Sequence, residues 1–161
     1  MENNEHIILG IDPGYGRMGF GVILVKGADI ELVDYGVMST LAGDNFEDRL
    51  LSIANDLHEI FLHHKPDIMA IEKLFFGQSS TTAMKVAESR GVAQLMSAQS
   101  GVPVIEFTPA QIKKALTGDG KATKKGVQQM VKELLSLPRI PKPDDAADAL
   151  AVAITASNTK W

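Results

Sequence analysis

The first forty residues carry short apolar runs of the kind that form β-strands. The run HIILGID at 6–12 ends on an acid, and the runs RMGFGVILVK at 17–26 and IELVDYGVM at 30–38 follow it, with a turn at 27–29 between them. Three sequential strands with such short links predict an antiparallel meander.

From residue 46 the period changes. Hydrophobic residues recur at steps of four and three, which indicates one face of an amphipathic helix; they are Phe46, Leu50, Ile53, Leu57 and Ile60. His63, His64 and Lys65 stand at the helix end, where cations suit the helix dipole, and Pro66 stops the helix. We therefore interpret the two histidines as helix-end residues rather than metal ligands.

The rest of the chain alternates strands and helices. The pattern predicts strands at 68–72 and 102–107, and helices at 80–100, 109–116, 123–135 and from 144 or 145 to about 156. Thr108 followed by Pro109 is typical of a helix N-cap. This order predicts one α/β domain over 1–161, a five-stranded mixed sheet with helices on both faces, preceded by a disordered tail at 1–5.

Composition narrows the class of protein. Hydrophobic residues make up 45% of the 161 residues and charged residues 22%, which is a globular balance. The chain has no cysteine, so disulfides, thiolate zinc sites and cysteine nucleophiles are excluded. No apolar run reaches the roughly 18 residues of a membrane span, and the acidic start MENNEH is no signal peptide. We expect a soluble, cytoplasmic protein with no membrane partner.

The charge is unevenly distributed along the chain. The net charge is −4, and residues 1–72 hold 13 acids against 4 basic residues, whereas residues 73–142 hold 11 basic residues against 4 acids. A local positive excess can attract phosphate whatever the total charge. A solvated helical surface would explain the same excess, so charge alone leaves both interpretations open.

Two acids each follow a predicted buried strand. Asp12 ends the strand at 6–12 and Glu72 ends the strand at 68–72, where α/β sheets place their ligand sites. If these strands are parallel neighbours, the two carboxylates lie side by side and repel each other unless a cation sits between them. Oxygen ligands of this kind favour Mg²⁺ or Mn²⁺.

A third acidic element opens the last predicted helix, with the sequence DDAAD at 144–148. Asp145 and Asp148 are three residues apart, and Asp144 and Asp148 are four apart, so either pair shares a helix face. The spacing does not decide between the pairs, although Asp144 directly follows Pro143 and suits the N-cap. Four carboxylates without a catalytic histidine or cysteine suit two-metal phosphodiester cleavage, with Asp12 as the natural bridging ligand.

A glycine-rich turn, Gly14-Tyr15-Gly16-Arg17-Met18-Gly19, spells the dinucleotide-binding pattern after the first strand. That pattern requires a helix next, and the β-branched segment FGVILV predicts a strand instead. We therefore reject a dinucleotide site and interpret the glycines as a tight turn close to a ligand.

The sequence resembles the RuvC Holliday-junction resolvases of the RNase H-like superfamily. The resemblance covers essentially the whole chain and rests on GIDPG at 10–14, IEKLFFG at 71–77, ESRGVA at 88–93 and DAADALAVAIT at 145–155. By position it implies Asp12, Glu72, Asp145 and Asp148 as catalytic and metal-binding residues, leaving Asp144 as a cap.

The resemblance also implies DNA contacts. Phe75 holds the place of an aromatic that stacks on bases at the junction centre. Phe76 is a second aromatic, and the sequence leaves open an exchange of roles between the two; the alternative is that either ring packs in the core. The lysines that it places on phosphate lie in the positive stretch and are Lys113 and Lys124, with Lys114, Lys121 and Lys125 beside them. Binding through such residues falls steeply with salt.

The resemblance further implies a homodimer with two Mg²⁺ ions per active site, Mn²⁺ substituting, that nicks four-way junction DNA symmetrically and leaves 5′-phosphate and 3′-hydroxyl ends. It also implies work with the RuvA–RuvB branch-migration complex. Met84, Ala87, Gly91 and Leu95 form an apolar stripe that is either the dimer surface or core.

The alternatives to a junction resolvase are a ribonuclease acting on RNA–DNA hybrids, a fragment of an actin-like ATPase or sugar kinase, and a junction-binding module that does not cleave.

Overall fold

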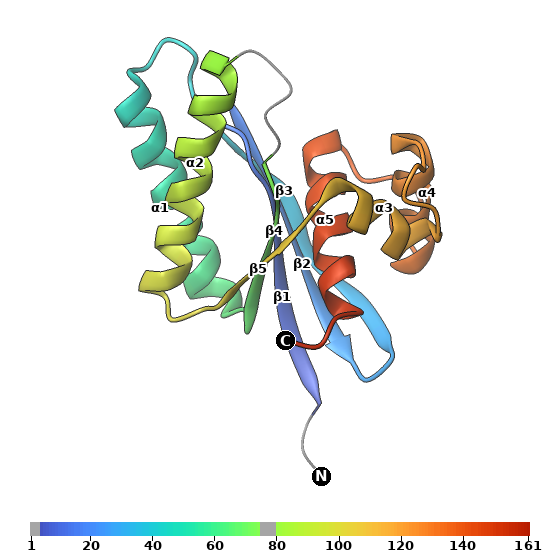
Figure 1. The fold of residues 1–161 in the computed structure, drawn as a ribbon. Helices are drawn as coiled ribbons and strands as arrows, with labels where there is room; N and C mark the ends of the chain where they lie inside the picture. The colour runs from blue at the N-terminus through green and yellow to red at the C-terminus, as the bar shows by residue number, and fades with distance from the viewer. Residues whose placement is uncertain (1–3, 75–79) are drawn as a thin grey trace.

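The computed structural model describes residues 4–74 and 80–161, which form a central sheet between two layers of helices (Figure 1). The strands in this part of the chain are β1 (Glu5–Asp12), β2 (Arg17–Lys26), β3 (Asp29–Ser39), β4 (Ile68–Glu72) and β5 (Val104–Phe107). The helices are α1 (Phe46–His64), α2 (Ser80–Gln99), α3 (Pro109–Thr117), α4 (Lys124–Leu134) and α5 (Asp144–Ser157).

The sheet has the order β3-β2-β1-β4-β5. Strands β1, β2 and β3 pair antiparallel, as the short links predict, and Gly27 at φ 61° makes the tight turn of the second hairpin. Strands β4 and β5 then add parallel to β1. The five-stranded mixed sheet expected from the sequence is therefore confirmed, and β2, not a helix, follows the glycine-rich turn.

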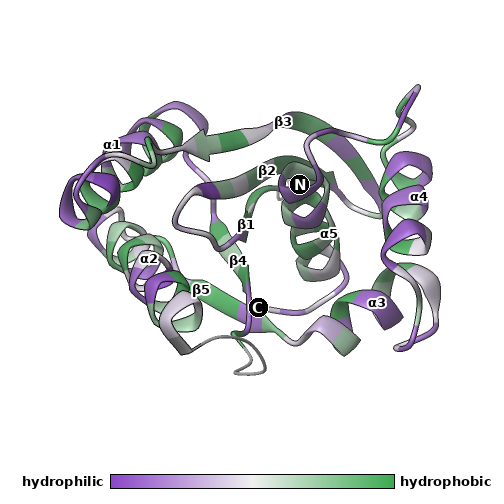
Figure 2. Ribbon diagram, turned by 90° about the horizontal axis from the view of Figure 1, so that it is seen from above, coloured by the Kyte–Doolittle hydropathy of each residue, from purple (hydrophilic) through white to green (hydrophobic). Residues whose placement is uncertain are grey.

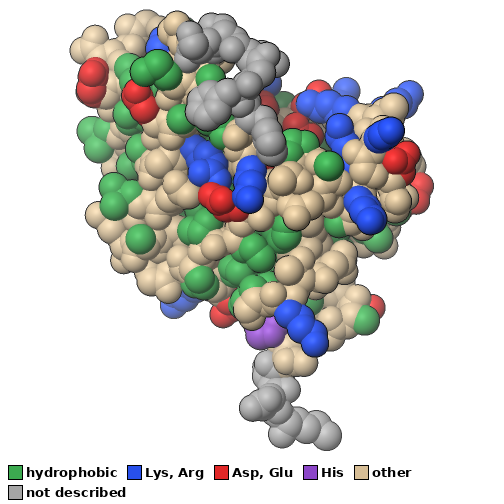
Figure 3. Space-filling view, viewed as in Figure 1, with side chains coloured by type: hydrophobic (Ala, Val, Ile, Leu, Met, Phe, Trp, Pro, Cys, Tyr) green, Lys and Arg blue, Asp and Glu red, His purple; other side chains and the backbone are tan. Residues whose placement is uncertain are grey.

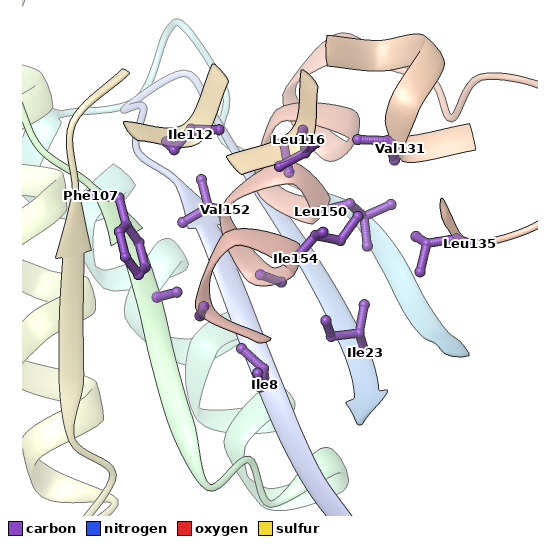
Figure 4. Close-up of a cluster of buried hydrophobic side chains, with 14 of the residues drawn as sticks. Ile8, Ile23, Phe107, Ile112, Leu116, Val131, Leu135, Leu150, Val152 and Ile154 are labelled. Atoms are coloured by element: carbon purple, nitrogen blue, oxygen red, sulfur yellow. The ribbon is translucent and has the colours of Figure 1, made fainter. Parts of the chain in front are cut away.

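Each face of the sheet has its own core. Helices α1 and α2 cover one face, where Leu9, Ile53 and Met69 are buried, and α3, α4 and α5 cover the other (Figure 2). Helix α5 lies directly on the sheet, and Leu150 and Ile154 are buried in the second core (Figure 4). Burial on both faces is what the nearly continuous apolar runs of β1 and β4 require.

Several boundaries differ from the expected ones by a residue or two. Glu5 already belongs to β1, where it pairs with Lys26, so the expected disordered tail at 1–5 is wrong for Glu5. Strand β5 starts at Val104 rather than at 102. The N-cap of α3 is Thr108, as predicted, and its hydroxyl accepts a hydrogen bond from the Gln111 backbone N–H.

Helix α1 ends where the sequence places it, before Pro66. His64 lies 2.9 Å from Asp34 of β3, which gives this histidine a structural partner. No helix in the described part of the chain has the length and hydrophobicity that a membrane crossing requires.

Candidate active site

Asp12 and Glu72 lie side by side at one edge of the sheet. Strands β1 and β4 are parallel neighbours in register, with Ile11 opposite Ile71, so the next residue of each strand is an acid at the same level. Ile11 and Ile71 are fully buried, whereas the two acids are only partly buried. The sequence therefore places both carboxylates at the point where the strands leave the core.

Helix α5 brings Asp145 and Asp148 to the same edge. The helix begins at Asp144, with Pro143 rather than Asp144 at the N-cap, so the expectation that Asp144 caps the helix is wrong. Proline supplies an extended backbone there without a side-chain cap, and Asp144 is exposed in the first turn. Asp145 and Asp148, three residues apart, are partly buried.

Glycines allow α5 to approach the strands closely. A methyl group at Gly10 of β1 would lie 2.0 Å from the carbonyl oxygen of Ala149, and one at Gly19 of β2 would lie 2.0 Å from that of Asp145. No L side chain fits such distances, so main chain packs against main chain. This contact fixes the distance from the helix acids to the strand acids.

Two cations neutralise the helix acids. Nε of Arg17 lies 2.8 Å from Oδ2 of Asp145. Nζ of Lys124 lies 3.2 Å from Oδ2 of Asp148 and 3.7 Å from Oδ2 of Asp144. The lysine comes from the N-terminus of α4, so α4 and α5 are joined at the end where the carboxylates gather.

Asp12 carries the strongest electrostatic perturbation. Burial, together with the carboxylates of Asp148, Glu72 and Asp145, raises the pKa of Asp12 from 3.8 to about 8. A carboxyl in such surroundings holds a proton unless positive charge compensates it. All four predicted acids therefore interact at Asp12.

The neighbouring groups shift in a consistent way. Burial raises the pKa of Glu72 and of Asp148, although Lys124 acts in the opposite direction on both. For Lys124 itself, burial acts to lower the pKa, but the attraction of Asp148, Asp144 and Asp12 outweighs it and raises the pKa. The edge of the sheet is thus an acidic site in need of cations.

Two hollows flank Glu72. A pocket of about 280 Å³ lies between β4, α3, α4 and α5, and its polar side chains are Glu72, Lys113, Lys124 and Asp148. A second hollow of about 250 Å³ joins Asp12 to Glu72 and Lys73. The first hollow places two ammonium groups beside the carboxylates, where an anionic substrate oxygen can be held.

The donor set fits divalent metal ions. The carboxylates of Asp12, Glu72, Asp145 and Asp148 offer only oxygen, and their mutual repulsion at Asp12 shows that they need positive charge. Among residues 4–74 and 80–161, no three His, Asp or Glu side chains already form a metal-ion cage. Asp145 is paired with Arg17 and Asp148 with Lys124.

The predicted phosphate-binding lysines divide into two groups. Lys113 and Lys124 line the pocket with Glu72. Lys114, Lys121 and Lys125 are exposed on α3, α4 and the loop between them. Figure 3 shows Lys and Arg side chains gathered over this part of the molecule. Phe75 and Phe76 lie outside the described residues.

Sequence reasoning did not find two arginines. Arg17 is one, because its pairing with Asp145 depends on how β2 meets α5. Arg90 of α2 is the other: its Nε donates to the backbone carbonyl of Glu72 at 3.2 Å, and its guanidinium also binds Glu106 of β5. It holds the end of β4, and its place in the ESRGVA motif was the only signal for it.

Comparison with known proteins decides the family. The family model for crossover junction endodeoxyribonuclease RuvC matches residues 8–156. The chain belongs to the RuvC family. The RuvC of Ruminiclostridium cellulolyticum is 48% identical over 95% of this chain and 92% of its own. The RuvC of Pseudothermotoga lettingae is 49% identical over 91% of each chain.

A solved RuvC shares the fold closely. Thermus thermophilus RuvC in complex with a Holliday junction substrate superposes with a TM-score of 0.89 and 36% identity, covering 93% of this chain and 92% of that one. The RuvC fold is therefore present over nearly the whole chain. Family membership makes the protein a crossover junction endodeoxyribonuclease and excludes the ATPase and sugar-kinase alternatives.

Proposed function

We propose that the protein resolves Holliday junctions with a two-metal site formed by Asp12, Glu72, Asp145 and Asp148. The observation that carries the proposal is the convergence of two strand-end acids and two helix acids at one edge, strong enough to raise the pKa of Asp12 to about 8. The solved Thermus thermophilus RuvC in complex with a Holliday junction substrate supports a four-way junction rather than an RNA–DNA hybrid.

The four carboxylates would hold two Mg²⁺ ions, with Mn²⁺ as a substitute. The chemistry that such ions supply is activation of a water and stabilisation of the departing oxygen of the phosphodiester. The carboxylates of Glu72, Asp145 and Asp148 all raise the pKa of Asp12, so Asp12 is the natural shared ligand. Arg17 and Lys124 would have to release Asp145 and Asp148 for these acids to bind metal.

The lysines of the pocket orient the phosphate. Lys113 and Lys124 line the 280 Å³ pocket together with Glu72 and Asp148, so their ammonium groups would bind the non-bridging oxygens of the scissile phosphodiester. Lys124 would then exchange Asp148 for a phosphate oxygen. In-line attack by water gives a 5′-phosphate and a 3′-hydroxyl, and no covalent intermediate with the protein is needed.

Symmetric cutting of two strands requires two such sites. We propose a homodimer that contacts through α2, because Met84 and Leu95 on this helix are 61% and 55% exposed. Exposed apolar side chains of this size on one helix favour an interface over core packing. Cooperation with a RuvA–RuvB branch-migration complex is also proposed, on family membership.

Cleavage of a labelled four-way junction with Mg²⁺ tests the proposal. Asp12→Asn keeps the shape of the side chain but removes the charge, so cutting should be lost while junction binding persists. Asp144→Asn makes the same change at an exposed acid, one helical turn before Asp148 on α5, and is the matched control; it should cut at nearly the wild-type rate. Wild-type cutting by Asp12→Asn would show that the four-carboxylate site is wrong.

A further inference from the structure

A groove separate from the two hollows beside Glu72 lies between the edge strand β3, helix α4 and the loop that leads to α5. It has a volume of about 550 Å³ and is lined by Tyr35, Gln129, Lys132, Pro138, Arg139, Ile140 and Lys142. We refer to it as the β3–α4 groove. Figure 2 shows β3 at the edge of the sheet, with the start of the strand on the side of α4 and its end on the side of α1.

The lining is cationic. Lys132, Arg139 and Lys142 contribute three positive charges, and no acid lines the groove. Among the described residues, none of the three forms an ion pair, in contrast to Arg17, Arg90 and Lys124. Glu133, beside the groove on α4, accepts a hydrogen bond from Gln129. The groove therefore presents positive charge without an ion-pair partner among the described residues, and it can attract an anion.

The groove is connected to the catalytic pocket along α4. Lys125, Gln129 and Lys132 are spaced i, i+4 and i+7, which places them on one face of the helix. Val127 and Val131 are buried and hold the opposite face against the core. Lys125 follows Lys124 of the catalytic pocket, and Lys132 lies about 10 Å further along the helix axis at about 1.5 Å per residue.

We propose that the β3–α4 groove binds the sugar-phosphate backbone of a duplex arm of the substrate, outside the point of cleavage. The inference rests on the proposed function and extends it to a second contact on the same DNA. Base pairs of duplex DNA are spaced about 3.4 Å along the axis, so roughly 10 Å corresponds to about three pairs beyond the catalytic lysines. Arginine and lysine bind phosphate oxygens, and the Tyr35 hydroxyl and the Gln129 amide add uncharged donors.

The continuity of the positive face favours DNA over an acidic protein. A polyanion held at Lys113 and Lys124 meets Lys125 and then Lys132 on one face of α4. The exposed acids beside this path are Asp144, which pairs with Lys124, and Glu133. DNA supplies evenly spaced phosphates over that length, with no requirement for an apolar anchor. An acidic protein would have to bind the groove without added contacts to the catalytic lysines.

Junction binding measured against salt concentration tests the inference. The variant is Arg139→Gln with Lys142→Gln, because both side chains are exposed and the substitutions leave the core unchanged. The matched control, Lys65→Gln with Lys160→Gln, removes two exposed cations at the end of α1 and near the C-terminus. Affinity for a four-way junction is measured in Ca²⁺ by fluorescence anisotropy, and cleavage at saturating enzyme is measured in Mg²⁺.

The groove variant should bind the junction on the order of tenfold more weakly than wild type, with a salt slope smaller by about 1.8 for each protomer in contact, since each lost phosphate contact removes about 0.9. The control should match wild type, and both variants should cut at the wild-type rate at saturation. Equal affinity and salt slope for the groove variant and control, with cutting intact, would overturn the groove and leave the proposed function standing. Wild type that neither binds nor cuts the junction would overturn the proposed function itself.

Discussion

Arg17 on β2 and Asp145 on α5 form an ion pair, with Nε 2.8 Å from Oδ2. The arginine is thus bound to a carboxylate that is proposed as a metal ligand. The guanidinium competes with a divalent ion for the same carboxylate oxygen. We therefore expect Arg17→Gln to bind Mn²⁺ several-fold more tightly than wild type in a calorimetric titration without DNA.

Arg139→Gln is the control for this titration, because it removes an exposed arginine of the β3–α4 groove rather than one at the carboxylates. It should leave Mn²⁺ affinity unchanged. Weaker Mn²⁺ binding by Arg17→Gln would assign the arginine the opposite role, that of orienting Asp145 for the metal.

The acid cluster should destabilise the metal-free protein as the pH rises from about 4 to about 8. The pKa of Asp12 is raised in the folded state from 3.8 to about 8, so the folded protein binds this proton more tightly than the unfolded chain. Stability from Asp12 is therefore fully present below about pH 4 and is lost as the pH rises toward about 8.

Thermal unfolding in a metal chelator measures this dependence. Asp12→Asn cannot ionise, so its melting temperature should fall less than that of wild type as the pH rises toward 8. Added Mg²⁺ should restore more stability to wild type than to the variant near pH 8. Parallel melting curves for the two proteins across this range would contradict the prediction.

The close approach of α5 to the sheet can be tested at Gly10. A methyl group there would lie 2.0 Å from the Ala149 carbonyl oxygen and 2.8 Å from the Ala153 nitrogen. Gly10→Ala should therefore lower the free energy of unfolding by about 3 kcal/mol or more, above the usual range for overpacking. Gly43→Ala, where an added methyl group meets nothing within 4 Å, should change it little. Equal unfolding midpoints in urea would refute the tight contact.

The proposed dimer surface on α2 can be tested at Leu95. A buried, unpaired carboxylate is costly at an interface, so Leu95→Glu should convert the dimer to monomers in analytical ultracentrifugation. Leu41→Glu places the same charge at a side chain that is 72% exposed in the link before α1 and should leave the dimer intact. A wild-type chain that sediments as a monomer would exclude the interface outright.

The two aromatic residues after β4 have different expected roles. If Phe75 stacks on bases at the junction centre, Phe75→Ala should lower junction cleavage more than Phe76→Ala does, since stacking on one base contributes about 1–3 kcal/mol. Both single variants are compared at subsaturating enzyme on the same junction. The reverse order would transfer the stacking role to Phe76.

Sequence alone accounts for the strand-end acids. Asp12 and Glu72 each follow a buried apolar run, and parallel pairing of those runs is enough to bring them together. The last helix was less determined, because Asp144 and Asp145 both share a face with Asp148. Only the family resemblance separated them, and the cap at Pro143 was missed because proline has no side-chain donor or acceptor to recognise.

The ion pairs were beyond sequence reasoning for a different reason. Arg17 meets Asp145 and Lys124 meets Asp148 across 128 and 24 residues, and the packing of α5 on β2 and α4 decides both pairs. Helical and strand periods specify which face a residue occupies, but not which partner lies opposite. The cationic stretch was predicted as a property of the segment, whereas its division between the pocket and the β3–α4 groove depends on the path of the loop before α5.

The main-chain contacts of Gly10 and Gly19 would set the ion selectivity of the proposed metal site. They hold the backbone that carries the strand acids and the backbone that carries the helix acids at a fixed separation. Oxygen ligands lie about 2.0–2.1 Å from Mg²⁺ but about 2.3–2.6 Å from Ca²⁺. In the proposed metal site only the side chains of the four acids could then move to accept the larger ion, so the fixed backbone would favour Mg²⁺ over Ca²⁺.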